Sequence, residues 1–580
     1  MKKLMLGNDA VARGLYEAGC RVVSSYPGTP STEITEAIAK YDEIYSEWAP
    51  NEKVACETAY GASMAGARSF CAMKHVGLNV AADPLFTAAY SGVNGGFVIA
   101  VADDSGMHSS QNEQDSRHYA AASKVPMLEP SDSAECLAFA KLAFEISERF
   151  DTPVILRLST RISHSQGLVE LSDRAELPLK EYVKNPSKYV MMPANAKGRH
   201  VFVEERTLKL KEYGAACPAN KVIEGGSVGV ITSGIAYQYA REALGDKATY
   251  LKLGLIHPLS EQMILDFAKK FDKIYVIEEL DSIIEDFCRA HGVNVAGKEL
   301  FSYIGEYSAE AIRSKILGEN TEYITVDEKI PVRPPVLCPG CPHRGVFYVL
   351  NKLKVFVSGD IGCYTLGAGA PLSAIDTTIC MGASISGLHG FNKARGADWE
   401  KKSVAVIGDS TFIHSGITGL IDIAYNASNS TVIILDNSIT GMTGHQQNPT
   451  TGYNIKGDPA VAVNLEALCK AVGINRVRVV DPFDIVGVET AVKEELAAAE
   501  PSVIIARRPC ALLKVVKAKP PVTVNSEKCR KCGMCFKMGC PAIKKSAEGR
   551  PIIDTTLCTG CGLCTKACKF DALKEDSHGC

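Results

Sequence analysis

The sequence lacks long hydrophobic runs and an excess of either charge. Its longest apolar runs, such as GGFVIAVA and STVIIL, are strand-sized and fall short of the ~20 residues that a membrane span needs. The 63 Lys and Arg nearly balance the 66 Asp and Glu, so the net charge of −3 provides no basic field for nucleic acid. The start, MKKLMLGNDAVARG, turns polar too early for a signal peptide, and no tandem repeat of solenoid length is present. We therefore expect a cytoplasmic globular protein.

Cysteine, by contrast, is abundant and unevenly placed. Nine of the 21 cysteines lie between Cys529 and Cys580. A secreted disulfide scaffold is short, whereas this chain has 580 residues with long helical and strand patterns. Cysteines gathered in one tail of such a chain indicate a metal site or an iron–sulfur cluster.

The tail contains two four-cysteine motifs, CRKCGMCFKMGCP and CTGCGLCTKACKF. Three thiolates on a tight loop bind three irons of a cubane cluster, and a cysteine of the other motif reaches the fourth iron. The motifs therefore predict two [4Fe–4S] clusters, the first held by Cys529, Cys532, Cys535 and Cys568 and the second by Cys540, Cys558, Cys561 and Cys564.

This tail resembles the bacterial two-cluster ferredoxin module, with two departures. One extra residue precedes Cys540, and Lys569 stands where the module usually has proline. Neither departure removes a ligand. The alternative is a pair of zinc ribbons, which normally use two C-x2-C pairs separated by a long gap.

The length predicts three to five domains, and strands that alternate with helices predict an α/β fold with parallel sheets. A polar stretch at about 171–222 is interpreted as a linker. We expect a first parallel-sheet domain with this trailing linker, a smaller α/β domain, a second parallel-sheet domain and the cysteine tail, at residues 1–190, 191–330, 331–520 and 521–580.

Two buried strands in the third region end in polar residues. Asp409 follows SVAVIG, and Asn437 follows STVIILD. Ligands of parallel sheets bind beyond the carboxyl ends of the strands, and a pair of hard oxygens there suits Mg²⁺ shared with phosphate. Gly408 allows the backbone to approach an anion, and the helix that follows presents its N-terminus to phosphate. The alternative is that Asp409 only caps that helix.

The spacing from G-D-S to D-N resembles the thiamine diphosphate signature. The resemblance implies that Asp409, the Asn437 side chain and the Ile439 carbonyl bind Mg²⁺, with Gly408 and Ser410 beside the cofactor. Ser410 stands where the family often has glycine, and Asp436 where it often has asparagine. His414, five residues after Asp409, is a further candidate for contact with the cofactor.

Thiamine enzymes also need a carboxylate against N1′ of the aminopyrimidine. In the family this glutamate lies nine residues before a helix glycine, and Glu52 lies nine residues before Gly61. The competing Glu57 has the wrong spacing. The alternative for Glu52 is a solvated helix residue.

Two further residues are candidates for substrate binding. SYPGTPSTE resembles the Y-P-I-T-P turn of 2-oxoacid:ferredoxin oxidoreductases, which implies that Thr29 contacts the substrate. Arg117 lies in the polar loop DDSGMHSSQNEQDSRHYA, where functional side chains gather, and is a candidate cation for a substrate carboxylate. Otherwise it is a surface arginine.

Together with CPGCPHR and KHVGLN, these motifs resemble the large (alpha) subunits of indolepyruvate ferredoxin oxidoreductases along the whole chain. The resemblance implies pyrimidine- and pyrophosphate-binding thiamine domains, with a transketolase C-terminal-like domain between them. It also implies oxidation of arylpyruvates (indolepyruvate, phenylpyruvate, hydroxyphenylpyruvate) with coenzyme A, a small beta subunit, ferredoxin as the acceptor, and a heterodimer or a dimer of heterodimers. The alternatives are a smaller substrate such as pyruvate, or an electron-transfer scaffold with a degenerate thiamine site.

Four cysteines outside the tail suggest a third cluster. Related oxidoreductases hold a proximal cluster with cysteines in places comparable to Cys338, Cys341, Cys363 and Cys510. A structural zinc ion and unligated thiols are the alternatives. His445, in MTGHQQNP, lies in a loop that could close on the cofactor.

Overall fold

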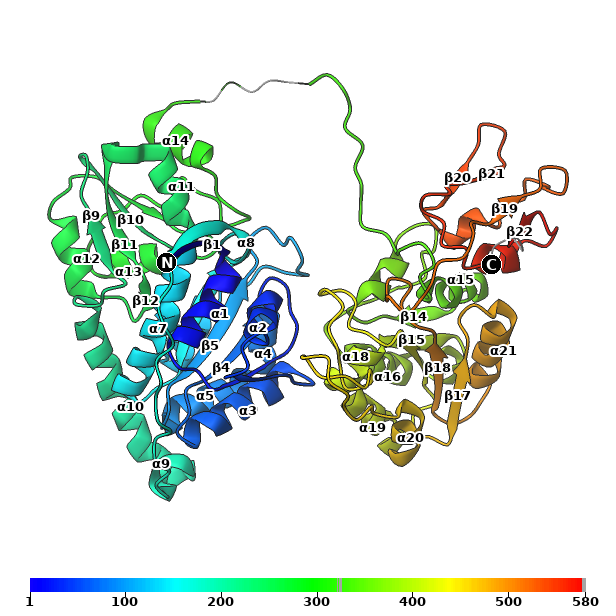
Figure 1. The fold of residues 1–580 in the computed structure, drawn as a ribbon, viewed down its shortest axis with the longest axis horizontal. Coiled ribbons are helices and arrows are strands. Elements are labelled where there is room, and N and C mark those ends of the chain that lie inside the picture. The colour runs from blue at the N-terminus through cyan, green and yellow to red at the C-terminus, as the bar shows by residue number, and fades with distance from the viewer. Residues whose placement is uncertain (321, 323–325, 576–580) are drawn as a thin grey trace. The chain divides into compact units, whose positions relative to one another are not determined.

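The computed structural model describes residues 1–320, 322 and 326–575. The chain forms two compact units, an N-terminal unit of Met1–Asp327 and a C-terminal unit of Glu328–Cys580 (Figure 1). Each unit is described by itself. No helix among the described residues combines the length and the apolarity needed to cross a membrane.

A seven-stranded sheet forms the centre of the N-terminal unit. Its strand order is β12-β6-β7-β5-β4-β2-β3, parallel except for β12. Strands β4 and β5, near the centre of the sheet, are buried along their whole length, which explains why most of their residues are apolar. The strands are β2 (Val22–Ser25), β3 (Tyr45–Trp48), β4 (Ser69–Lys74), β5 (Phe97–Asp103), β6 (Met127–Leu128), β7 (Val154–Ser159) and β12 (Leu255–His257).

Helices cover both faces of this sheet. Helices α1 and α7 pack together over one face, and α3 and α5 pack over the other. Strands β1 (Lys2–Leu6) and β8 (Gln166–Glu170) pair antiparallel beside it. The helices are α1 (Gly7–Glu17), α2 (Thr32–Ile38), α3 (Glu52–Met64), α4 (His75–Val80), α5 (Ala82–Ser91), α6 (Arg117–Ser123), α7 (Ser133–Phe150) and α8 (Thr160–His164).

The smaller α/β domain has a four-stranded sheet in the order β13-β10-β11-β9, with β9 antiparallel. Strand β12 follows β11 and crosses to the larger sheet, which joins the two domains. Their elements are β9 (Lys221–Ile223), β10 (Val228–Ser233), α11 (Gly234–Leu244), η1 (Gly245–Lys247), β11 (Ala248–Leu253), α12 (Glu261–Ala268), β13 (Ile274–Ile277), α13 (Ile283–Ala290) and α14 (Ala309–Leu317).

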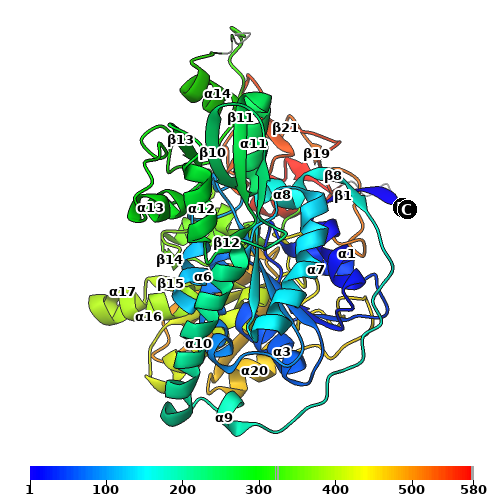
Figure 2. The same ribbon diagram turned by 90° about the vertical axis from the view of Figure 1, so that its left-hand side faces the viewer.

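The predicted linker contains a long helix. The short α9 (Pro186–Tyr189) is followed by α10 (Pro193–Gly214), and both are labelled in Figure 2. Helix α10 packs against α5 and buries Val203, Arg206 and Leu210. The linker interpretation was wrong for this stretch, because so narrow a buried stripe leaves little hydrophobic periodicity in the sequence.

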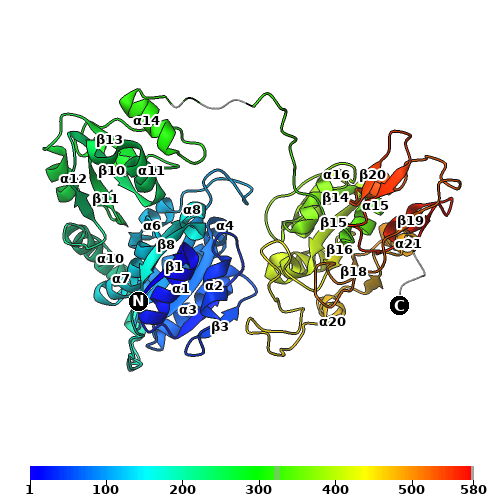
Figure 3. The same cartoon turned by 45° about the horizontal axis from the view of Figure 1, so that its top comes forward.

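The C-terminal unit is built on a parallel five-stranded sheet in the order β14-β15-β16-β18-β17. Figure 3 shows β14, β15, β16 and β18 side by side. The elements are α15 (His343–Leu353), β14 (Phe356–Ser358), η2 (Cys363–Ala368), α16 (Ala383–Arg395), α17 (Ala397–Glu400), β15 (Ser403–Gly408), α18 (Asp409–Thr411), η3 (Phe412–Gly416), α19 (Ile417–Tyr425), β16 (Thr431–Asp436), α20 (Leu465–Ala471), β17 (Arg476–Val480), α21 (Ile485–Leu496) and β18 (Ser502–Arg507).

The cysteine tail forms two antiparallel strand pairs, β19 with β22 and β20 with β21. Arg344 of α15 donates to the carbonyl oxygens of Met538 and Gly539, which anchors the tail to this unit. The tail elements are β19 (Thr523–Val524), η4 (Phe536–Met538), β20 (Ile543–Lys545), β21 (Pro551–Ile553), α22 (Leu563–Ala567) and β22 (Leu573–Lys574).

Candidate active site

The C-terminal unit brings three predicted cofactor residues together at the carboxyl edge of its sheet. Asp409 follows β15 and Asn437 follows β16, and these strands are neighbours in register. One terminal atom of the Asn437 amide lies 2.9 Å from the carbonyl oxygen of Ile439 and 3.1 Å from Asp409 Oδ1. The structure places the amide oxygen at that position, so three oxygens converge there, which suits a hard cation. Only a half-turn of the amide would place the nitrogen there, where it would donate to both oxygens.

Asp409 is deeply buried, with 2% of its surface exposed. Burial raises its pKa to about 7, and the nearby carboxylate of Asp436 adds to this effect. The Thr450 hydroxyl donates to Asp409 Oδ2 at 3.1 Å. A buried carboxylate with so raised a pKa has too little positive charge around it, which is the electrostatic condition that a bound cation would correct.

The backbone around Asp409 is closely packed. A methyl group on Gly408 would lie 2.6 Å from the ring of Tyr364, so only glycine fits there. Ser410 accepts a hydrogen bond from Thr440 at 2.9 Å. The helix that begins at Asp409 continues through a π-helical turn that carries His414. His414 is buried, and its Nδ1 lies 2.9 Å from the hydroxyl of its neighbour Ser415.

In the N-terminal unit, Glu52 is the first residue of α3 and is 4% exposed. It packs against Gly77 of α4, where an added methyl group would lie 2.6 Å from Glu52 Oε1. The glycine of the KHVGLN motif therefore makes room for this carboxylate. Glu57, by contrast, is exposed and pairs with Lys53 on the helix surface.

Thr29 lies in the loop that follows β2, at the carboxyl edge of the seven-stranded sheet. Its carbonyl oxygen accepts a hydrogen bond from the Ser109 hydroxyl at 3.3 Å. Lys74, the last residue of β4, approaches the same loop, because a methyl group on Gly28 would lie 3.2 Å from Lys74 Cβ. Thr29, Ser109 and Lys74 therefore lie close together at the carboxyl edge of the seven-stranded sheet.

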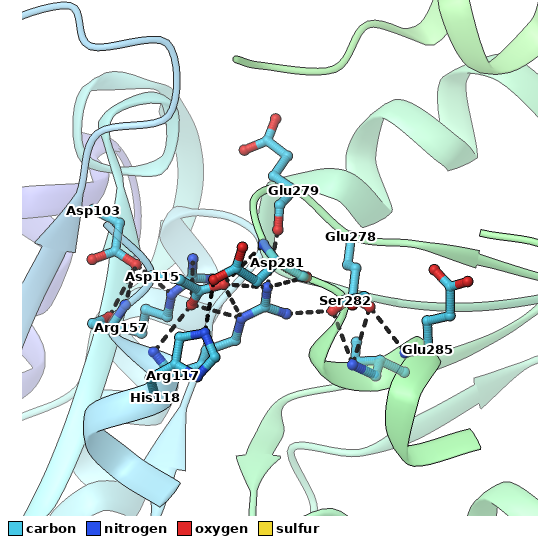
Figure 4. A network of polar contacts seen from close by, with 12 residues as sticks. Asp103, Asp115, Arg117, His118, Arg157, Glu278, Glu279, Asp281, Ser282 and Glu285 are labelled. Atoms are coloured by element: carbon cyan, nitrogen blue, oxygen red, sulfur yellow. Dashed lines mark hydrogen bonds and ion pairs between the residues drawn. The ribbon is translucent and has the colours of Figure 1, made fainter. Parts of the chain in front are cut away.

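Arg117 does not lie where the sequence predicts. Its side chain is 2% exposed and is held between the carboxylates of Asp115, at 2.6 Å, and Glu278, at 2.5 Å (Figure 4). It also donates to the carbonyl oxygens of Glu279 and Asp281. The substrate-binding prediction for Arg117 is therefore corrected, because these partners already engage its guanidinium, which joins α6 to the segment after β13.

The tail arranges its cysteines around two cavities. Each cavity is lined by the four cysteines that the crossed motifs predict for one cluster. The first is lined by Cys529, Cys532, Cys535 and Cys568, and the second by Cys540, Cys558, Cys561 and Cys564.

The four remaining candidate cysteines gather near the start of α15. Cys338 interacts electrostatically with Cys341, Cys363 and Cys510, and the Cys341 amide donates to the Cys338 carbonyl at 3.1 Å. His445 Nε2 lies 3.8 Å from the sulfur of Cys510. Over the described residues, no three His, Cys, Asp or Glu side chains are placed to bind one shared metal ion.

Three regions of the chain match known families. Residues 13–218 match "Pyruvate flavodoxin/ferredoxin oxidoreductase, thiamine diP-bdg", residues 360–506 match "Thiamine pyrophosphate enzyme, C-terminal TPP binding domain", and residues 551–574 match "4Fe-4S binding domain". The chain is 41% identical to indolepyruvate oxidoreductase subunit IorA of Archaeoglobus fulgidus, over 99% of this chain and 97% of that protein. This chain belongs to the IorA family.

The chain is also similar to other proteins. The IorA subunit of Pyrococcus horikoshii is 40% identical, over 100% of this chain and 97% of that protein. The 2-oxoglutarate synthase subunit KorA of Archaeoglobus fulgidus is 25% identical over 51% of this chain and 94% of that protein. The solved 2-oxoglutarate:ferredoxin oxidoreductase of Magnetococcus marinus aligns over 55% of this chain and 65% of that chain, with 18% identity and a TM-score of 0.45.

The chain is thus part of a ferredoxin-dependent 2-oxoacid oxidoreductase that uses thiamine diphosphate and iron–sulfur clusters. This confirms the family, the α/β fold class and these two cofactors as the sequence predicts them. Three neighbours of the site were not predicted from the sequence: Thr450, Lys74 and Gly77. Lys74 and Gly77 both had a signal, because they are the first and fourth residues of the quoted KHVGLN motif, whereas Thr450 had none.

Proposed function

We propose that this enzyme oxidises arylpyruvates (indolepyruvate, phenylpyruvate and hydroxyphenylpyruvate) with coenzyme A. The arylpyruvate loses its carboxyl group as CO₂, its acyl group forms the thioester of aryl-acetyl-CoA, and two electrons reduce two ferredoxins while one proton is released. The observation that carries this proposal is the near full-length similarity to proteins named indolepyruvate oxidoreductase.

Thiamine diphosphate, when bound, supplies the electron sink that decarboxylation of a 2-oxoacid needs. Asp409, the Asn437 amide oxygen and the Ile439 carbonyl would hold its Mg²⁺, since these groups converge at one sheet edge. Gly408 and Ser410 would border the diphosphate, and His414 would lie one helical turn further on. Mg²⁺ would thereby neutralise the carboxylate of Asp409.

Glu52 would exchange a proton with N1′ of the aminopyrimidine. Its burial at the start of α3 suits this role, because a carboxyl group shielded from water interacts strongly with one directed partner. Gly77 supports it by leaving space beside the carboxylate. Thr29 would contact the substrate from the loop after β2.

The cysteine tail would carry electrons away one at a time through two [4Fe–4S] clusters. The support is that each predicted set of four cysteines lines its own cavity. Cys338, Cys341, Cys363 and Cys510 would hold a third, proximal cluster, with His445 beside it. The partners would be a small IorB-type beta subunit and ferredoxin, in a heterodimer or a dimer of heterodimers.

An anaerobic assay tests the substrate class. The chain, co-expressed with its small subunit, is given coenzyme A, ferredoxin and a panel of 2-oxoacids. We expect arylpyruvates to have the highest kcat/KM. A preference for pyruvate would favour the same chemistry on small substrates. No turnover together with no bound thiamine would favour a scaffold with a degenerate site. Iron content decides the cluster number, with about eight irons for two clusters and about twelve for three.

A further inference from the structure

Lys74 is a buried lysine without a carboxylate partner. It ends β4, and only 8% of its surface is exposed. Its Nζ donates to the carbonyl oxygen of Ser109 at 2.7 Å and to the Ser109 hydroxyl at 3.3 Å. Within residues 1–320, 322 and 326–575, no Asp or Glu oxygen lies within ion-pair distance of this ammonium. Buried lysines are normally paired, so this one is a candidate to bind an anion.

Asp104, the carboxylate whose charge acts on Lys74, already accepts hydrogen bonds from neutral donors. It accepts from the amide of Ser109 at 2.8 Å, from the hydroxyl of Ser110 at 2.5 Å and from the hydroxyl of Thr160 at 2.6 Å. Burial lowers the pKa of Lys74 to about 8, and Asp104 offsets this only in part. The ammonium therefore remains short of negative charge.

The position of Lys74 suggests which anion it binds. Its side chain packs on Gly28 in the Thr29 loop, and Ser109 bonds both to the Lys74 ammonium and to the Thr29 carbonyl. Three residues further along the chain, Gly77 packs on Glu52. Lys74 thus contacts the loop of Thr29, the residue proposed to contact the substrate, and it lies three residues before the glycine that packs on Glu52, the residue proposed to activate the cofactor.

We propose that Lys74 binds the carboxylate of the 2-oxoacid substrate, the role that the sequence suggested for Arg117. The inference rests on the proposed function. Every 2-oxoacid has this carboxylate. A lysine that binds it therefore contributes to recognition of 2-oxoacids as a class rather than to recognition of the aryl group. Decarboxylation releases that group as neutral CO₂, after which the ammonium has no anion to retain.

The test uses Lys74→Met, which removes the charge at similar volume, in the complex with the small subunit. A charge-assisted hydrogen bond is worth enough that its loss should raise KM for the oxoacid by about 10- to 100-fold. KM for coenzyme A and for ferredoxin should stay unchanged. Lys298→Met is the matched control, because Lys298 also donates to carbonyl and hydroxyl groups, in the smaller domain. It should leave all three values unchanged.

A second readout isolates the carboxylate. Inhibition by 3-phenylpropanoate is compared with inhibition by its amide, and Lys74→Met should weaken the acid while leaving the amide unchanged. If Lys74→Met does not fold, Lys74→Gln, which keeps a donor for Ser109, takes its place. An unchanged KM for the oxoacid, or a raised KM for coenzyme A instead, would overturn the proposal. A wild-type enzyme active only on pyruvate would refute the arylpyruvate assignment alone, and Lys74 would then be tested with pyruvate.

Discussion

Replacing Arg117 by alanine tests whether the buried ion network joins the two domains of the N-terminal unit. The side chains of Arg117, Asp115 and Glu278 are each at most 2% exposed. Removing one partner of a buried ion pair costs about 3–5 kcal/mol, because the other charge is left buried and uncompensated. Two carboxylates lose their partner here, but Arg157 remains 3.6 Å from Asp115. We therefore expect the free energy of unfolding to fall by about 4 kcal/mol.

The loss should depend on pH. Burial alone would raise the pKa of Asp115, but Arg117 and Arg157 outweigh it and hold this pKa well below its usual range. A carboxylate with a depressed pKa stabilises the fold above its unfolded pKa of about 3.9, and this stability is lost as pH falls through the folded pKa. Without Arg117, burial raises the pKa of Asp115, so this carboxylate binds a proton at a higher pH than in the wild type. The variant should therefore lose less stability near pH 5 than near pH 8.

Urea unfolding measures the effect through the fluorescence of Trp48 in β3, in a background where the other tryptophan, Trp399, is replaced by phenylalanine. The matched control is Arg161→Ala. Arg161 makes two hydrogen bonds to Glu306, at 2.6 and 2.7 Å, but is 51% exposed, so its loss should cost about 1 kcal/mol or less. Equal losses for the two variants, or no dependence on pH for Arg117→Ala, would refute the reasoning.

Three further predictions concern the cofactors. Glu52→Gln should lower kcat by about 10²- to 10⁴-fold and slow hydrogen–deuterium exchange at thiamine C2, whereas Glu57→Gln should change neither; equal effects would contradict the assignment. Asp409→Ala should abolish Mg²⁺-dependent thiamine diphosphate binding measured by calorimetry, and Thr450→Val should weaken it by about 10- to 100-fold; full binding by the alanine variant would exclude Asp409 as a ligand. Cys568→Ser should perturb or remove one cluster, seen as altered iron content and altered electron paramagnetic resonance of the reduced protein; an unchanged spectrum would exclude Cys568.

Much of the cofactor chemistry could be predicted from the sequence because its determinants are local. The cysteine motifs place three thiolates on one tight loop, and only the fourth ligand of each cluster comes from the other motif. Asp409 and Asn437 each follow a buried strand, and parallel strands bring their carboxyl ends to one edge. Thr450 could not be predicted in this way, since a loop with no periodic pattern carries it to Asp409.

The long helix α10 shows a different limit. The buried face of α10 is narrow and includes Arg206, so its sequence is as polar as that of a linker. Its packing against α5 is a property of the tertiary structure alone. Hydrophobic periodicity in a sequence reports the apolar face that a helix buries. A helix that buries only a narrow face therefore shows little periodicity in its sequence.

By itself, the sequence determined the α/β class, the thiamine and iron–sulfur cofactors and the residues that repeat their motifs, because short-range spacing sets those features. Only the tertiary structure decided which cation is free to face an anion. Lys74 ends β4 within the KHVGLN motif and Arg117 begins α6, but neither local sequence shows which charges surround the side chain. The segment after β13 supplies Glu278 and two carbonyl oxygens to Arg117, whereas Ser109 supplies only neutral oxygens to Lys74. The charge balance around a buried group depends on residues distant in sequence, so it appears only when the chain is folded.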